Sequence, residues 1–149
     1  MRSTLLVLLL FGGVSVASAA EEVDWHGLLN AKALRCALPF GAMARWDSGK
    51  PRISQSGPDA NFILIFESID HTRGTARLIG NQATSNVMAF HTPAGLHFIE
   101  QTNFGSVMIT SVFPRLTSDG FMAVHSRHLA TLAGQPIPSQ AYGTCKVLE

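Results

Sequence analysis

From residue 60 onward, apolar runs of strand length alternate with polar turn signals at intervals of about 9 to 14 residues. Phe, Ile, Val and Thr dominate the runs, and these residue types favour β-strands. One of the turns, Thr92-Pro93-Ala94-Gly95, has Pro and Gly where a β-turn accepts them best. This alternation is typical of an antiparallel meander. It predicts six strands, over Asn61–Ile69, Thr75–Ile79, Thr84–His91, Leu96–Thr102, Ser106–Phe113 and Phe121–His128.

The segments on either side of this meander carry weaker signals. We expect Leu34–Phe40 to form a first strand, and Glu22–Ala33 has the apolar spacing of a short helix. Asp47–Asp59 holds two Pro, two Gly and three Ser, and it is therefore predicted to be an exposed loop. Gly134–Gln140 contains too much proline for a central strand, so we expect it to lie extended along the surface.

Several of the predicted strands are apolar on both faces. Leu64 and Phe66 face one way, while Ile63 and Ile65 face the other. The helix and loops could cover the second face, a barrel could have a partly covered outer wall, or a partner chain could bury it. The predicted fold is mostly β: an antiparallel meander forming a small barrel or strongly curved sheet of 7–8 strands, with a short N-terminal helix.

The N-terminus has the features of a secretory signal peptide. Arg2 is followed by an apolar run of 12 residues, Leu5–Val16, and by Ala17-Ser18-Ala19, which fits an A-x-A cleavage site. As a helix this run would rise only ~18 Å, which is short of a ~30 Å hydrocarbon core, so a membrane anchor is disfavoured. We expect residues 1–19 to be removed and residues 20–149 to form a single domain without stable membrane insertion.

Two cysteines, Cys36 and Cys145, lie near opposite ends of this domain. An even cysteine number in an exported protein favours a disulfide, which would join the two ends of the domain. In the chain-entropy model, closing a loop of roughly 100 residues stabilises a protein by up to about 4.7 kcal/mol. The alternative is a pair of free buried thiols. The spacing excludes a redox C-x-x-C motif and a two-cysteine metal site.

Composition and charge narrow the classes of function. The chain has 149 residues, of which 46% are hydrophobic and 14% charged, so it is too apolar to be disordered. Its formal net charge is +1, and no basic patch is visible. A nucleic-acid partner is therefore not expected.

The chain has six histidines, which are candidate acids, bases or metal ligands. On a strand His125 would share one face with Arg127, while Ser126 and His128 would share the other. No H-E-x-x-H or G-x-S-x-G motif occurs, and no catalytic residue, metal or cofactor is predicted. The simplest interpretation places the histidines at strand ends, hydrogen-bonded to backbone or water.

A ligand site is the more informative alternative. His125 and Arg127, projecting beside Phe121, would form an apolar wall with a cationic end, and one Arg can bind a carboxylate through two hydrogen bonds. These three residues are the candidate ligand-binding set. The competing interpretation pairs Arg127 with Glu100 or Glu67 in a structural ion pair.

Four segments carry a family resemblance, namely Ala76–Asn81 (ARLIGN), Leu96–Glu100 (LHFIE), Ala123–His128 (AVHSRH) and Pro138–Cys145 (PSQAYGTC). In them the chain resembles an uncharacterised family of small exported bacterial proteins, over roughly residues 33 to 145. The resemblance implies export to the bacterial periplasm or the extracellular space. It implies no activity.

Three classes of function remain open. The leading hypothesis is an exported β-domain that binds a small apolar or amphipathic ligand. It requires a cavity of several hundred cubic ångströms with His125 or Arg127 at its wall, and a filled interior would exclude it. The alternatives are an envelope structural or protein-interaction domain, for example a homodimer, and a histidine-dependent hydrolase.

Export and disulfide formation predict the mass of the secreted product. The mature chain should begin at Ala20 and be two hydrogens lighter than its reduced form. Intact-mass spectrometry before and after reduction measures both. A chain that retains residues 1–19, or a mass unchanged by reduction, would contradict the respective expectation.

Overall fold

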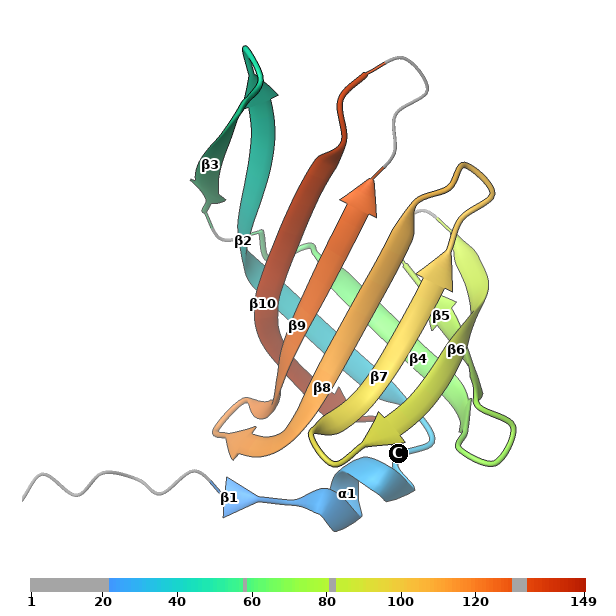
Figure 1. The fold of residues 1–149 in the computed structure, drawn as a ribbon. Coiled ribbons are helices and arrows are strands. Elements are labelled where there is room, and N and C mark those ends of the chain that lie inside the picture. Colours follow the sequence, from blue (N-terminus) through green and yellow to red (C-terminus); the bar gives the residue numbers. More distant parts are fainter. Residues whose placement is uncertain (1–21, 58, 81–82, 130–133) are drawn as a thin grey trace, which may run out of the picture.

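The computed structural model describes residues 22–57, 59–80, 83–129 and 134–149 (Figure 1). The predicted signal peptide, residues 1–19, lies outside the described residues. The described chain forms an antiparallel β-barrel with a short helix beneath one end (Figure 1).

Eight strands form the closed barrel, and each pairs antiparallel with its two neighbours. From β4 to β10, each strand pairs with the next strand in the chain. The strand β2 closes the barrel by pairing with both β4 and β10. The barrel strands are β2 (Leu34–Asp47), β4 (Ile63–Asp70), β5 (Thr75–Ile79), β6 (Thr84–Thr92), β7 (Gly95–Gln101), β8 (Val107–Thr117), β9 (Gly120–Leu129) and β10 (Ile137–Val147).

The predicted fold class is confirmed. The six strands of the meander lie where the apolar runs placed them, and β5 has the predicted bounds. The strand expected to end at Phe113 continues to Thr117 as β8, and the one expected to end at Phe40 continues to Asp47 as β2. Alternate residues of each strand face the interior, and Leu64 and Phe66 are buried there. The interior therefore contains the hydrophobic core.

The loop predicted over Asp47–Asp59 is wrong, because Lys50–Ser56 forms the strand β3, which pairs with the outer half of β2. Ser48 and Gly49 both have positive φ values, 51° and 78°, as a tight two-residue hairpin turn requires. Every residue of β3 is exposed, so no alternation of buried positions marks it in the sequence. Its Pro51 is tolerated because β3 pairs on one side only.

The surface position predicted for Gly134–Gln140 is also wrong for its second half. Ile137–Val147 forms β10, a central strand between β2 and β9. Pro138 pairs with His128 of β9, whereas pairing with β2 begins only at Ser139. The missing N–H of Pro138 therefore falls where β10 has one neighbour instead of two.

The helix is shorter than the predicted Glu22–Ala33. It covers Trp25–Asn30 as α1, and the Asp24 side chain caps it by accepting a hydrogen bond of 2.7 Å from the Gly27 N–H. Before the helix, β1 (Glu22–Val23) pairs with β8. Leu28 is fully buried, so α1 packs across the lower end of the barrel (Figure 1).

Closure of the barrel depends on the seam between β2 and β10. Cys36 and Cys145 lie opposite each other in this seam and form a disulfide, as predicted. Above them β2 contains a bulge, in which Leu38 and Pro39 lie opposite Gly143 alone. A Cβ atom at Gly143 would overlap the carbonyl oxygen of Ala37, so glycine permits the close approach of the two strands.

Gly143→Ala should therefore destabilise the barrel by about 1–3 kcal/mol, the usual cost of overpacking. Gly57→Ala is the matched control, because no atom lies within 4 Å of a Cβ placed there. Urea denaturation of both variants measures the free energy of unfolding. Equal stabilities would show that the seam can widen without cost.

Candidate functional site

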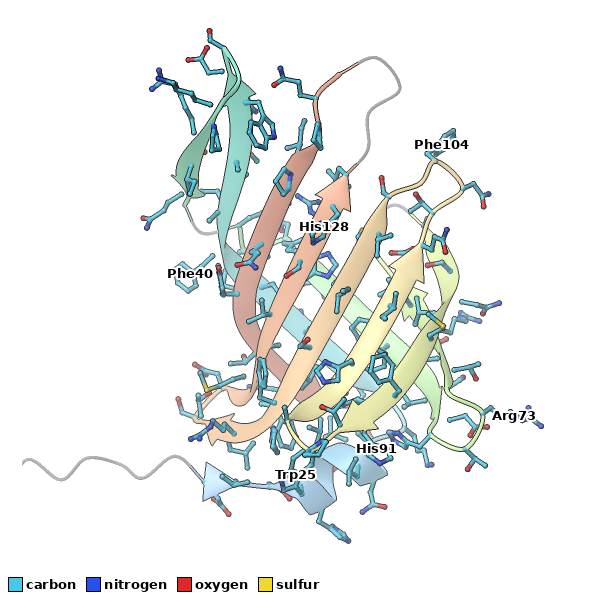
Figure 2. All side chains as sticks on the ribbon, viewed as in Figure 1. Trp25, Phe40, Arg73, His91, Phe104 and His128 are labelled. Atoms are coloured by element: carbon cyan, nitrogen blue, oxygen red, sulfur yellow. A yellow bond between two sulfur atoms is a disulfide. The ribbon has the colours of Figure 1, made fainter. Side chains whose placement is uncertain are left out.

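A cavity of about 760 Å³ opens at the end of the barrel opposite α1. Figure 2 shows Phe104, which lines it, at this open end and Trp25 at the helix end. Its apolar walls include Phe62, Leu64 and Met108. The barrel below is filled, because Phe66 and Phe98 stack with their ring centroids 3.8 Å apart. The interior thus has a solid lower half and a hollow upper half.

His125 projects from β9 into the base of this cavity. Its side chain is almost fully buried, its Nδ1 atom lies 2.8 Å from the Thr110 hydroxyl, and its ring meets the Phe62 ring edge-on. Burial, reinforced by the nearby charge of Arg127, lowers the pKa of His125 to about 4. The imidazole is therefore neutral near pH 7 and presents one donor and one acceptor nitrogen.

Arg127 lies two residues further along the same face and also lines the cavity. Its Nε atom donates a hydrogen bond of 3.0 Å to the Ser139 hydroxyl of β10. Its guanidinium carbon lies 5.6 Å from the centroid of the Phe62 ring, which is a cation–π distance. Ser139 and Phe62 thus hold the guanidinium inside the open end of the barrel.

The ion pair considered for Arg127 is not formed. Glu67 faces outward and pairs with Arg77 at 2.8 Å. Glu100 faces inward, and its carboxyl group accepts a hydrogen bond from the Ser85 hydroxyl. In the part of the chain that the structure describes, no carboxylate lies within 4.0 Å of the Arg127 nitrogens.

Phe121 shares the inward face with His125 and Arg127, as the period-two alternation predicts, but it lies outside the cavity. It is 4% exposed and sits opposite Cys145 in the filled half of the barrel. Phe62, from the start of β4, is the aromatic wall beside Arg127 instead. A ligand-binding role for His125, Arg127 and Phe121 stays a prediction.

Sequence reasoning missed Glu100, Ser85 and Met108 as cavity residues. Glu100 lies two residues after Phe98 on the same strand, so its inward orientation could be inferred from the sequence. Its place in the cavity could not. That place depends on which strands lie side by side. Pairing of β7 with β8 and of β8 with β9 brings Glu100, Met108 and Arg127 into one row.

The histidines are distributed over separate regions. His97 lies on the outer wall between the hydroxyls of Ser111 and Thr92, each 2.9 Å from a ring nitrogen. The His71 and His91 rings lie 6.4 Å apart, and Figure 2 shows His91 at the helix end. Among the described residues, no group of three or more His, Cys, Asp and Glu side chains could hold a metal ion.

Among the described residues, no helix has both the length and the apolar character needed to span a membrane. Comparison with protein-family models, with curated proteins and with solved structures gives no match to this chain. The geometry of the cavity is therefore the basis for a functional proposal.

The buried His125 predicts a pH-dependent stability. Its pKa is about 4 when folded and about 6.5 when unfolded, so between these values only the unfolded chain binds the proton. Stability should be unaffected by this group above pH 6.5 and should fall by up to about 3 kcal/mol as the pH drops to 4. His71 and His97, whose pKa values burial also lowers, add effects of the same sign.

The contribution of His125 can be isolated by substitution. In His125→Gln the loss of unfolding free energy between pH 6.5 and 4 should be smaller than in the wild type, whereas His26→Gln, at an exposed position of α1, should leave it unchanged. Urea titrations at several pH values provide the measurement. An identical pH dependence in all three proteins would show that His125 does not carry this effect.

Proposed function

We propose that this protein binds a small amphipathic molecule with an acidic head group in the open end of the barrel. The single observation that carries the proposal is the guanidinium of Arg127, which lies in an apolar-walled cavity without a carboxylate partner among the described residues. A cation in such a place is a binding group for an anion.

The size and lining of the cavity support this proposal. A volume of about 760 Å³ lies within the range of ~300–1,000 Å³ typical of small-molecule sites. Leu64, Leu78 and Met108 provide apolar contact for a hydrocarbon part, while Arg127 and the neutral His125 provide polar contact. Such sites combine mostly apolar walls with a few polar groups that fix the orientation of the ligand.

The guanidinium is also oriented for this role. Its Nε–H is engaged by Ser139, and the Phe62 ring lies beside it. These contacts restrain the long side chain before a ligand arrives, which lowers the entropy cost of binding. Neither contact neutralises the positive charge.

The two alternatives have less support. Exposed aromatic side chains occur on the outer wall, but Phe40 and Tyr142 lie on β2 and β10 whereas Phe90 lies on β6, four strands from β10. They do not form one docking face. For a hydrolase, the hydroxyl at His125 belongs to Thr110, and Ser126 faces outward, where Gln140 donates a hydrogen bond to it.

The proposal includes export. The predicted signal peptide over residues 1–19 and the disulfide between Cys36 and Cys145 support a location in the bacterial periplasm or outside the cell. There the protein would encounter amphipathic molecules outside the cytoplasm.

Dodecanoate is a suitable probe for the acidic amphiphile. The wild-type protein should bind it, and Arg127→Met, which keeps the apolar stem but removes the charge, should weaken binding about tenfold or more. Arg35→Met, at an exposed position on β2, is the control and should bind like the wild type. Isothermal titration calorimetry measures the affinities.

Two results would contradict the proposed function. One is a wild-type protein that does not bind dodecanoate. The other is an Arg127→Met variant that binds it as tightly as the wild type does.

A further inference from the structure

A second charged group, the carboxyl group of Glu100, lies in the same cavity as Arg127. Glu100 on β7 is opposite Met108 on β8, and Met108 is opposite Arg127 on β9. The two charged residues therefore lie in one row with a single strand between them. At ~4.8 Å per strand their backbones are about 10 Å apart.

The two side chains turn away from each other. Arg127 reaches toward β10, where its Nε–H meets the Ser139 hydroxyl. Glu100 reaches toward β6, where it accepts a hydrogen bond from the Ser85 hydroxyl. Two long, oppositely charged side chains at this separation could form an ion pair. Instead, each is hydrogen-bonded to a serine on the neighbouring strand that lies farther from the other charged residue.

Neither Glu100 nor Arg127 forms an ion pair with another charged side chain among the described residues. Within the described ranges, Glu100 has no Lys or Arg within 4.0 Å, and Arg127 has no carboxylate. Serine hydroxyls orient both groups without neutralising them. The row thus presents an anion-binding group and a cation-binding group on either side of Met108, inside a cavity that is open to solvent.

We infer that the ligand is a zwitterionic amphiphile, with an anionic group for Arg127, a cationic or hydrogen-bond-donating group for Glu100, and an apolar chain. This inference rests on the proposed function and makes it more specific. A simple fatty acid would satisfy Arg127 but would leave the Glu100 carboxyl group facing a ligand without a donor. A simple alkylamine would leave Arg127 without an anion.

The apolar part of such a ligand has a defined place. Leu64 on β4 and Leu78 on β5 line the same cavity across from the charged row. An amphiphile held by its head group at Met108 would therefore place its chain against these residues. The charged row selects the head group, and the opposite wall contributes apolar contact.

Three twelve-carbon probes that differ only in their head group test this inference. They are 2-aminododecanoate, dodecanoate and dodecylamine, titrated calorimetrically near pH 7.5 at concentrations below micelle formation. The wild type should bind 2-aminododecanoate about tenfold more tightly than dodecanoate, because its carboxylate can bind Arg127 and its ammonium group Glu100 once both long side chains turn back toward Met108. Dodecylamine should bind most weakly.

Glu100→Gln identifies the group responsible. It keeps the shape and can still accept the Ser85 hydrogen bond, so the fold should persist, which circular dichroism verifies. The variant should lose the roughly tenfold preference for 2-aminododecanoate while binding dodecanoate at least as well as the wild type. Glu67→Gln on the outer wall is the matched control and should retain the preference.

The outcomes separate the two proposals. If wild-type protein binds dodecanoate and 2-aminododecanoate equally, and Glu100→Gln changes neither affinity, the zwitterion inference is overturned while the proposed function stands. If none of the three probes binds the wild type, the proposed function is overturned together with the inference.

Discussion

The pairing of β2 with β10 is the constraint on which the rest of this structure depends. These are the first and last strands of the barrel, and their contact converts a curved sheet with two open edges into a closed wall. The Cys36–Cys145 disulfide lies within that contact, where it connects two cysteines that are 109 residues apart in the chain. Gly143 lets the two backbones approach at the bulge above the disulfide. Without closure, β9 would not be held opposite β4 and β5, and the cavity would lose its continuous wall.

The interior changes character along the barrel axis. Toward α1 the inward positions carry Phe66 and Phe98, and Leu28 of α1 is buried at the end of the barrel. Toward the open end the inward positions carry Ser85, Glu100 and Arg127, which line the cavity. Collapse of this end would bury charged groups at high cost. The same alternation of side chains therefore produces a packed core in one half and a persistent cavity in the other.

The sequence predicts the parts of this fold that follow from local patterning. Three features could be predicted in this way: the strands of the meander, the shared face of His125 and Arg127, and the cysteine pair. The first two depend on residues close together in the chain, and the third depends on the number of cysteines. The strand β3 escapes prediction because all its residues are exposed, and β10 because Pro138 suggests a surface segment. The partnership of Glu100 and Arg127 in one row depends on strand order and register. No local pattern of residues encodes these.

The absence of an ion pair between Glu100 and Arg127 is the observation on which the zwitterion inference depends. Two opposite charges whose only role was stability would be expected to pair, since pairing offsets part of their desolvation cost. Here Ser85 and Ser139 hold the two groups apart, so each charge remains directed at the cavity. Both groups line a cavity that is open to solvent. If the zwitterion inference holds, Ser85 and Ser139 are positioning residues, because they keep the two charges available for the anionic and cationic parts of one head group.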